Sequence, residues 1–274
     1  MEWITLIVIG LLAGFIGALV GLGGGIIIVP SLLYFGSYTF LLDEVTPQVA
    51  VGTSLLIMIF TGLSSTLTYL KHKTVDYKSG LIFFMGSGPG SLLGAWINRD
   101  LDINTFNIYF GIFMIFVSII LMIRNKLKPL TPKKGYRINR TFIDQRGATF
   151  EYGYSPFLGL SLSFVVGFIS GIFGIGGGSL MVPAMILIFL FPPHVAIATS
   201  MFMIFLSSIV SSGAHISLGN VNWLYALALI PSAWLGAKLG ATTNTKIKSN
   251  TLVQILRIML IVVGIRLIYQ GFAG

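Results

Sequence analysis

Residues 14–30 read GFIGALVGLGGGIIIVP, an apolar segment that three consecutive glycines, Gly23–Gly25, interrupt before a second apolar run begins. Residues 167–183 read GFISGIFGIGGGSLMVP, and the two stretches align without a gap at an offset of 153 residues. Each glycine weakens a helix by roughly 1 kcal/mol relative to alanine. Three in a row therefore predict that one helix ends and another begins at Gly23–Gly25, and again at Gly176–Gly178.

The composition indicates an integral membrane protein. Of the 274 residues, 55% are hydrophobic and 9% are charged, and the mean hydropathy is +0.93. A soluble domain carries roughly 25% charged residues, so this chain cannot cover a water-facing surface. Five runs without any charged side chain are each about as long as the ~20 residues that cross a bilayer, or longer: residues 49–70, 79–98, 103–123, 157–193 and 195–237. They predict an all-α polytopic membrane protein.

The net charge of +9 has a membrane explanation. Residues 124–156 are hydrophilic and hold eight lysines and arginines against Asp144 and Glu151. Basic loops of membrane proteins lie on the cytoplasmic side, so we predict a cytoplasmic linker there. The predicted partner is the lipid bilayer, with no nucleic acid. The chain has no cysteine, which excludes disulfides and thiolate metal sites, and we expect neither a metal nor a cofactor.

A second pair of matching segments divides the chain into two homologous halves. Residues 47–54 read PQVAVGTS and residues 193–200 read PHVAIATS. We therefore predict three parts: a first membrane repeat at residues 1–123, the basic linker at 124–156, and a second membrane repeat at 157–274.

The number of crossings in each half decides the relative orientation of the repeats. If each glycine-broken stretch crosses once, each half has four crossings and the repeats are parallel. If it makes two short crossings, each half has five and the repeats are inverted. The inverted arrangement satisfies the positive-inside rule better, because it places six lysines inside: Lys71, Lys73, Lys78, Lys238, Lys246 and Lys248. We favour inverted repeats whose broken helices meet near the membrane midplane, with both termini outside.

The glycine breaks predict a binding site for a small anion. A helix that begins at such a break presents unpaired N–H groups and the positive end of its dipole, and glycine lets a ligand come close to them. Gly-broken segments at matching positions of two halves are typical of transport sites. Nearby hydroxyl pairs recur in both halves. A single such pair would be explained by hydrogen bonds between helices, but its recurrence favours a shared site. The predicted substrate-binding residues are Gly23, Gly24, Gly25, Ile26, Thr53, Ser54, Gly176, Gly177, Gly178, Ser179, Thr199 and Ser200.

The pattern Gly-x-Gly-Gly-Gly-x-x-x-Val-Pro, followed in both halves by Pro-x-Val-Ala-x-x-Thr-Ser, resembles the sulfite exporter TauE/SafE family. The resemblance covers nearly the whole chain, and the basic linker is its least family-like part. It implies a permease of the bacterial or archaeal inner membrane that moves sulfur-containing anions such as sulfite, thiosulfate or organosulfonates. The residues alone indicate only a small anion.

The uncharged runs also bear on how such a transporter is driven. They contain no carboxylate for a proton relay, and His215 is the only histidine within a long run. Moving one negative charge out of a cell whose interior is negative gains ~2.3 kcal/mol per 100 mV, so we expect efflux. An anion channel and uptake of a different organic anion stay open, as does the oligomeric state, a homo-oligomer included. The core holds no His-Glu-x-x-His motif and no paired carboxylates, so we expect no enzyme.

Overall fold

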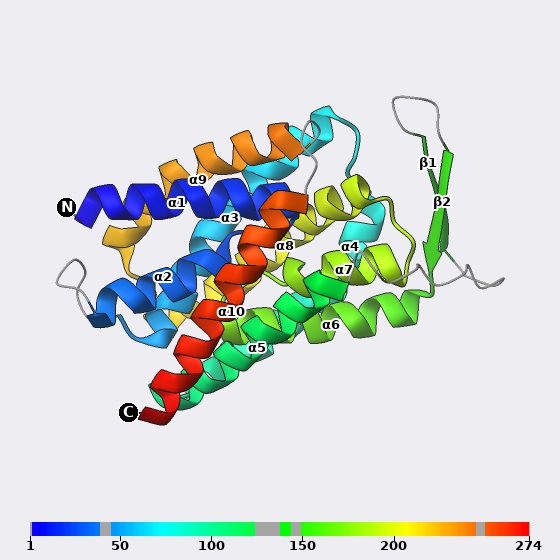
Figure 1. Ribbon diagram of the computed structural model, residues 1–274. Helices are drawn as coiled ribbons and strands as arrows, with labels where there is room; N and C mark the ends of the chain where they lie inside the picture. Colours follow the sequence, from blue (N-terminus) through cyan, green and yellow to red (C-terminus); the bar gives the residue numbers. More distant parts are fainter. Residues whose placement is uncertain (1, 39–44, 124–137, 144–148, 245–249, 274) are drawn as a thin grey trace.

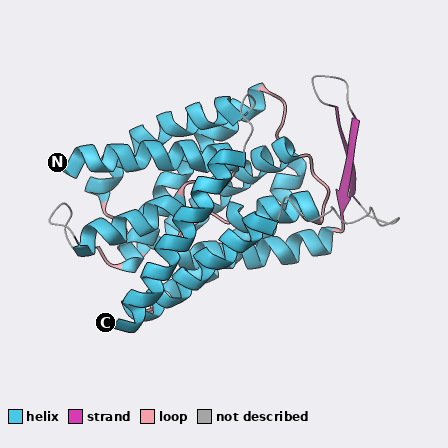
Figure 2. Cartoon of the chain, viewed as in Figure 1, coloured by secondary structure: helices cyan, strands magenta, loops and turns pink. Residues whose placement is uncertain are grey.

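Along the chain, a β-hairpin separates two sets of helices in the computed structural model, which describes residues 2–38, 45–123, 138–143, 149–244 and 250–273 (Figures 1 and 2). The first set comprises α1 (Glu2–Val20), α2 (Gly25–Tyr38), α3 (Pro47–Lys71), α4 (Tyr77–Asn98) and α5 (Ile103–Ile123). The hairpin pairs β1 (Ile138–Ile143) with β2 (Thr149–Tyr154) in antiparallel register. The second set comprises α6 (Pro156–Phe173), α7 (Gly178–Leu187), α8 (Pro193–Ser217), α9 (Trp223–Asn244) and α10 (Asn250–Ala273).

Seven described helices are long and apolar enough to cross a membrane: α1, α3, α4, α5, α6, α8 and α9. This confirms the prediction of a polytopic helical membrane protein. The chain is mostly helical rather than all-α, because part of the predicted linker forms the hairpin. Its strands alternate side chains between two faces, and the buried Tyr152 and Tyr154 pack against the helices. Lys246, Lys248 and most of the basic linker residues lie outside the described residues.

The helices α3 and α8 form the centre of the bundle and contact each other directly. In the apolar windows of α3 and α8, 78% and 72% of the residues are buried, against 39–56% for the other five spanning helices. Around this pair, α1 packs on α9, α4 on α6, and α5 on α10. Every one of these contacts joins the first set of helices to the second.

Glycine allows the outer helix pairs to approach closely. A Cβ atom at Gly14 of α1 would overlap the backbone carbonyl of Ala233 in α9, and one at Gly90 of α4 would overlap that of Phe164 in α6. Small residues at such contacts let membrane helices pack backbone against backbone. Both ends of the chain lie at one end of the bundle, and the hairpin stands at the opposite end (Figure 1).

Candidate functional site

The two glycine-rich stretches connect helix to helix through the same backbone conformation. The chain leaves α1 at Val20 and enters α2 at Gly25, and it leaves α6 at Phe173 and enters α7 at Gly178. Positive φ angles, which glycine adopts without a steric penalty, occur at equivalent positions of both stretches: 82°, 82° and 96° at Gly21, Gly23 and Gly24, and 68°, 74° and 65° at Gly174, Gly176 and Gly177. We call residues 21–25 the first break and residues 174–178 the second break.

The two breaks pack directly against each other. A Cβ atom at Gly25 would overlap the carbonyl oxygen of Gly174, and one at Gly178 would overlap the carbonyl oxygen of Gly21. The contact is reciprocal, since each break places its first carbonyl against the helix start of the other. The structure therefore brings together two stretches that lie 153 residues apart in the sequence.

Each break accepts a hydrogen bond from one serine of the opposite half. Ser54 Oγ of α3 donates a hydrogen bond to Gly174 O, and Ser200 Oγ of α8 donates one to Gly21 O, both at 2.9 Å. Both serines are buried. Their hydroxyl protons are therefore committed to the protein in this conformation.

We expect Ser54→Ala and Ser200→Ala each to lower the free energy of unfolding by about 1–3 kcal/mol, because each substitution leaves a buried carbonyl without its donor. The thermal midpoint in detergent would measure the effect. Ser217→Ala is the matched control, because Ser217 is exposed and its hydroxyl bonds only to Ala214 O within α8. Equal midpoints for all three variants would contradict a structural role for the two buried serines.

The neighbouring threonines hold loops. Thr53 Oγ1 accepts a hydrogen bond at 3.0 Å from Asn222 N, in the loop between α8 and α9. Thr199 Oγ1 accepts one at 3.0 Å from Asp76 N, which immediately precedes α4. In each predicted Thr-Ser pair, the serine is therefore hydrogen-bonded to the break of the opposite half and the threonine to a loop of that half.

The start of each short helix carries hydrogen-bond donors without an acceptor in the described part of the chain. At the start of α2 these include the amides of Gly24, Gly25 and Ile26, and at the start of α7 the amides of Gly177 and Ser179. The Ser179 hydroxyl also has no partner among the described residues, although the residue is fully buried. Ser179 aligns with Ile26, so the second break alone adds a hydroxyl to this set.

Two apolar side chains fill the space beside the breaks. Met58 of α3 lies close to glycines of both breaks, with its Cε and Sδ atoms in the space that side chains at Gly23, Gly25 and Gly176 would need. Ile204 of α8, which aligns with Met58, packs beside Gly23 and Gly176. All residues of both breaks are buried, so this conformation closes the site to solvent. Nothing in the sequence distinguished Met58 from other core residues.

Buried polar side chains of the two central helices α3 and α8 form a set, which we call the seam, that the sequence analysis did not identify as a site. Thr61 Oγ1 donates to Gly23 O at 2.9 Å, which connects the seam to the first break. Several polar groups of the seam have no hydrogen-bond partner among the described residues: the hydroxyls of Thr66, Ser208, Ser211 and Ser212, and both ring nitrogens of His215. The signal was present as hydroxyls at equivalent positions, since Thr61, Ser65 and Thr66 align with Ser207, Ser211 and Ser212.

Among the described residues, no group of three or more His, Cys, Asp or Glu side chains could hold a metal ion. The polar chemistry at the breaks is therefore that of backbone amides and hydroxyls, which suits an anion.

Comparison with known proteins places this architecture among membrane transporters. The family described as sulfite exporter TauE/SafE matches residues 6–267. A "Probable membrane transporter protein YunE" of Bacillus subtilis (strain 168) is 58% identical over 99% of both chains. A "Probable membrane transporter protein" of Xylella fastidiosa (strain Temecula1) is 26% identical over 97% of this chain and 94% of its own. "Probable membrane transporter protein MJ0441" of Methanocaldococcus jannaschii is 28% identical over 95% and 93%.

Proposed function

Because the chain belongs to the sulfite exporter TauE/SafE family, we propose that it is a secondary transporter that exports a small sulfur-containing anion across the plasma membrane. Its multi-pass helical architecture and its membrane-transporter relatives make it a membrane transporter. The family name supports a sulfur oxyanion, so sulfite, thiosulfate and organosulfonates are the substrates to examine. The relatives also point to a transporter rather than an enzyme.

One observation carries the proposed binding site: unpartnered donors meet at the two breaks. Buried amides and hydroxyls without an acceptor cost free energy, on the order of 1–3 kcal/mol each. An oxyanion placed at the starts of α2 and α7 would accept these hydrogen bonds and gain from both helix dipoles. No lysine or arginine is needed there, which avoids the cost of burying one in the membrane.

The proposal includes two inverted repeats whose breaks meet near the midplane. Several pairwise contacts support a two-fold relation between the halves, because exchanging the first five helices for the last five reproduces them: α1 with α9 becomes α6 with α4, and α3 with α9 becomes α8 with α4. The serine and threonine hydrogen bonds described above follow the same exchange. If α2 and α7 each cross the membrane, each half makes five crossings and the two halves have opposite orientations.

Closed packing around the breaks favours a transporter over an open channel. A transporter exposes its site to one side at a time, so a conformation with Met58 and Ile204 packed against the breaks fits such a cycle. An anion that leaves a cell whose interior is negative moves down the membrane potential. A monoanion gains ~2.3 kcal/mol per 100 mV on leaving the cell, and a dianion about twice that.

Proteoliposomes test this function. We expect sulfite flux to saturate with concentration, and the accumulation ratio of sulfite at equilibrium to rise about tenfold when ~60 mV is imposed in the direction that drives the anion out of its cytoplasmic side, if one charge crosses. Liposomes without protein provide the background. Flux that rises linearly without saturation would indicate a channel, and saturable flux that ignores the imposed potential would contradict potential-driven export. A panel of thiosulfate, sulfoacetate, taurine, sulfate and chloride would define the substrate.

A further inference from the structure

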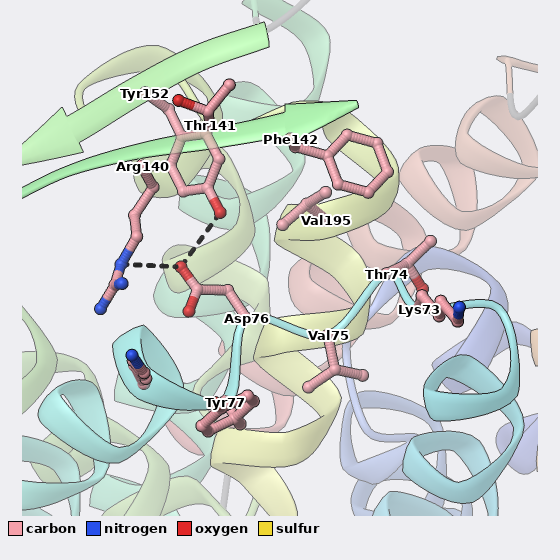
Figure 3. Close-up of a pocket in the computed structure, with 11 residues that line it drawn as sticks. Lys73, Thr74, Val75, Asp76, Tyr77, Arg140, Thr141, Phe142, Tyr152 and Val195 are labelled. Carbon is pink, nitrogen blue, oxygen red and sulfur yellow. Dashed lines mark hydrogen bonds and ion pairs between the residues drawn. The ribbon is translucent and has the colours of Figure 1, made fainter. Parts of the chain in front are cut away.

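A polar pocket lies between the β-hairpin and the segment that joins α3 to α4 (Figure 3). It stands at the hairpin end of the bundle, opposite both chain termini (Figure 1). Its volume is about 290 Å³, at the lower end of the range on the order of 300–1,000 Å³ typical of ligand sites. The pocket therefore has room for a small ligand.

The lining of this pocket is positively charged. It includes Lys73, Lys78 and Arg140 against one carboxylate, Asp76, so three positive groups face one negative group. The two lysines are exposed and form no ion pair with a described residue. Thr74, Thr141 and Tyr152 also line the space.

The Asp76 carboxylate has hydrogen-bond donors other than Arg140. Its carboxylate accepts hydrogen bonds from Ser79 N at 3.1 Å, Ser79 Oγ at 2.6 Å and the Tyr152 hydroxyl at 3.1 Å. Burial and the Asp76 charge raise the pKa of Tyr152, which keeps its phenol protonated as a donor. Arg140 Nε lies 3.8 Å from Asp76 Oδ2, too far for a hydrogen bond. Nε is buried and has no hydrogen-bond partner in the described part of the chain.

Aromatic contacts fix the hairpin in place over the helices. Tyr154 of β2 packs on Phe83 of α4 at 5.0 Å between ring centroids and on Phe189 at 5.2 Å. Tyr152 packs on Phe191 at 4.2 Å, and Gly153 N donates to Phe189 O at 3.1 Å. Arg140 therefore comes from a hairpin anchored against both halves, and it lines the same pocket as Lys78 of α4, whereas Lys73 lies on the other side of Asp76 (Figure 3). The pocket is a built feature of the fold.

We propose that this pocket is a second anion site, separate from the glycine breaks, which binds a small multivalent oxyanion such as phosphate or sulfate. Arg140 binds the anion from the hairpin, and Lys78 binds it from the first turn of α4. The anion thereby cross-links the hairpin to α4. The same chemistry fits a free oxyanion or the phosphate of an anionic lipid headgroup. The site does not depend on the identity of the transported substrate.

Thermal stabilisation of the full-length protein by inorganic phosphate tests the site. In phosphatidylcholine nanodiscs we expect a saturable rise in the unfolding midpoint. Arg140→Gln should weaken the apparent affinity about tenfold, since it removes a charged donor, and Lys78→Gln about threefold. Lys78 has no described ion-pair partner, so its variant cannot fail by breaking a native ion pair. Lys71→Gln is the matched control, because Lys71 is exposed, near in sequence and outside the pocket lining.

Two further arms separate the alternatives. The Ser179→Ala variant, which alters the second break, should keep the thermal stabilisation by phosphate. Loss of this stabilisation in Ser179→Ala, together with normal stabilisation in Arg140→Gln, would overturn the assignment to this pocket. Unchanged affinity in Arg140→Gln and Lys78→Gln would overturn it as well. Nanodiscs containing phosphatidylglycerol distinguish the source of the ligand. Weaker binding of free phosphate in them supports a headgroup in the pocket, and equal binding supports a soluble oxyanion.

Discussion

The substitution Gly178→Ala is expected to reduce anion transport about 100-fold while leaving the protein folded. Gly178 begins α7 with an ordinary helical φ, so alanine brings no backbone strain there. Its Cβ atom would instead overlap the carbonyl oxygen of Gly21 and crowd Ser200 Oγ. Overpacking of this kind costs about 1–3 kcal/mol. The breaks must move apart, and a displacement of about 1 Å at a site can cost roughly 100-fold in rate.

Initial transport rates in proteoliposomes, with size-exclusion profiles of the same preparations, measure this effect. Gly213→Ala is the control because Gly213 lies within α8, has a helical φ and has open space where its Cβ would be. Alanine there should leave transport unchanged and stabilise the helix by roughly 1 kcal/mol. Normal transport by Gly178→Ala would show that contact between the breaks is not required.

The second large effect is expected from Ser179→Ala, which should weaken substrate affinity about tenfold or more without loss of stability. A hydrogen bond to a charged group contributes about 1.5–3 kcal/mol, or roughly 10- to 150-fold in affinity. In the closed conformation the Ser179 hydroxyl is buried without a partner in the described part of the chain, so its removal takes no hydrogen bond to those residues away. The expected result is thus a higher sulfite KM with an unchanged or slightly raised unfolding midpoint.

Ser200→Ala, at a residue close to the second break, is expected to lower stability, in contrast to Ser179→Ala. The Ser200 hydroxyl bonds to Gly21 O, so this variant should lose stability. Transport assays over a range of sulfite concentrations, together with thermal unfolding, separate the two serines. A wild-type KM in Ser179→Ala would remove that hydroxyl from the proposed site, and a fall in its midpoint would give Ser179 a structural role instead.

Local properties of the chain made its general architecture predictable. Long uncharged runs can be stable only in a bilayer, and their number predicted a polytopic membrane protein, which the seven spanning helices confirm. The doubled glycine and Pro-x-Val-Ala-x-x-Thr-Ser patterns were sufficient to suggest the TauE/SafE family, and its match over residues 6–267 confirms it. Hydrophobicity is read one residue at a time and needs no knowledge of distant contacts.

The tertiary structure alone decided what each polar side chain does. Ser54, Ser200 and Ser179 are equally good hydroxyl donors in the sequence, yet two of them bind carbonyls 120 and 179 residues away and the third has no partner among the described residues. Met58 and the Arg140–Asp76 pair likewise owe their positions to elements from different parts of the chain. A hydrogen bond depends on distance and direction between two groups, and packing of remote helices sets both.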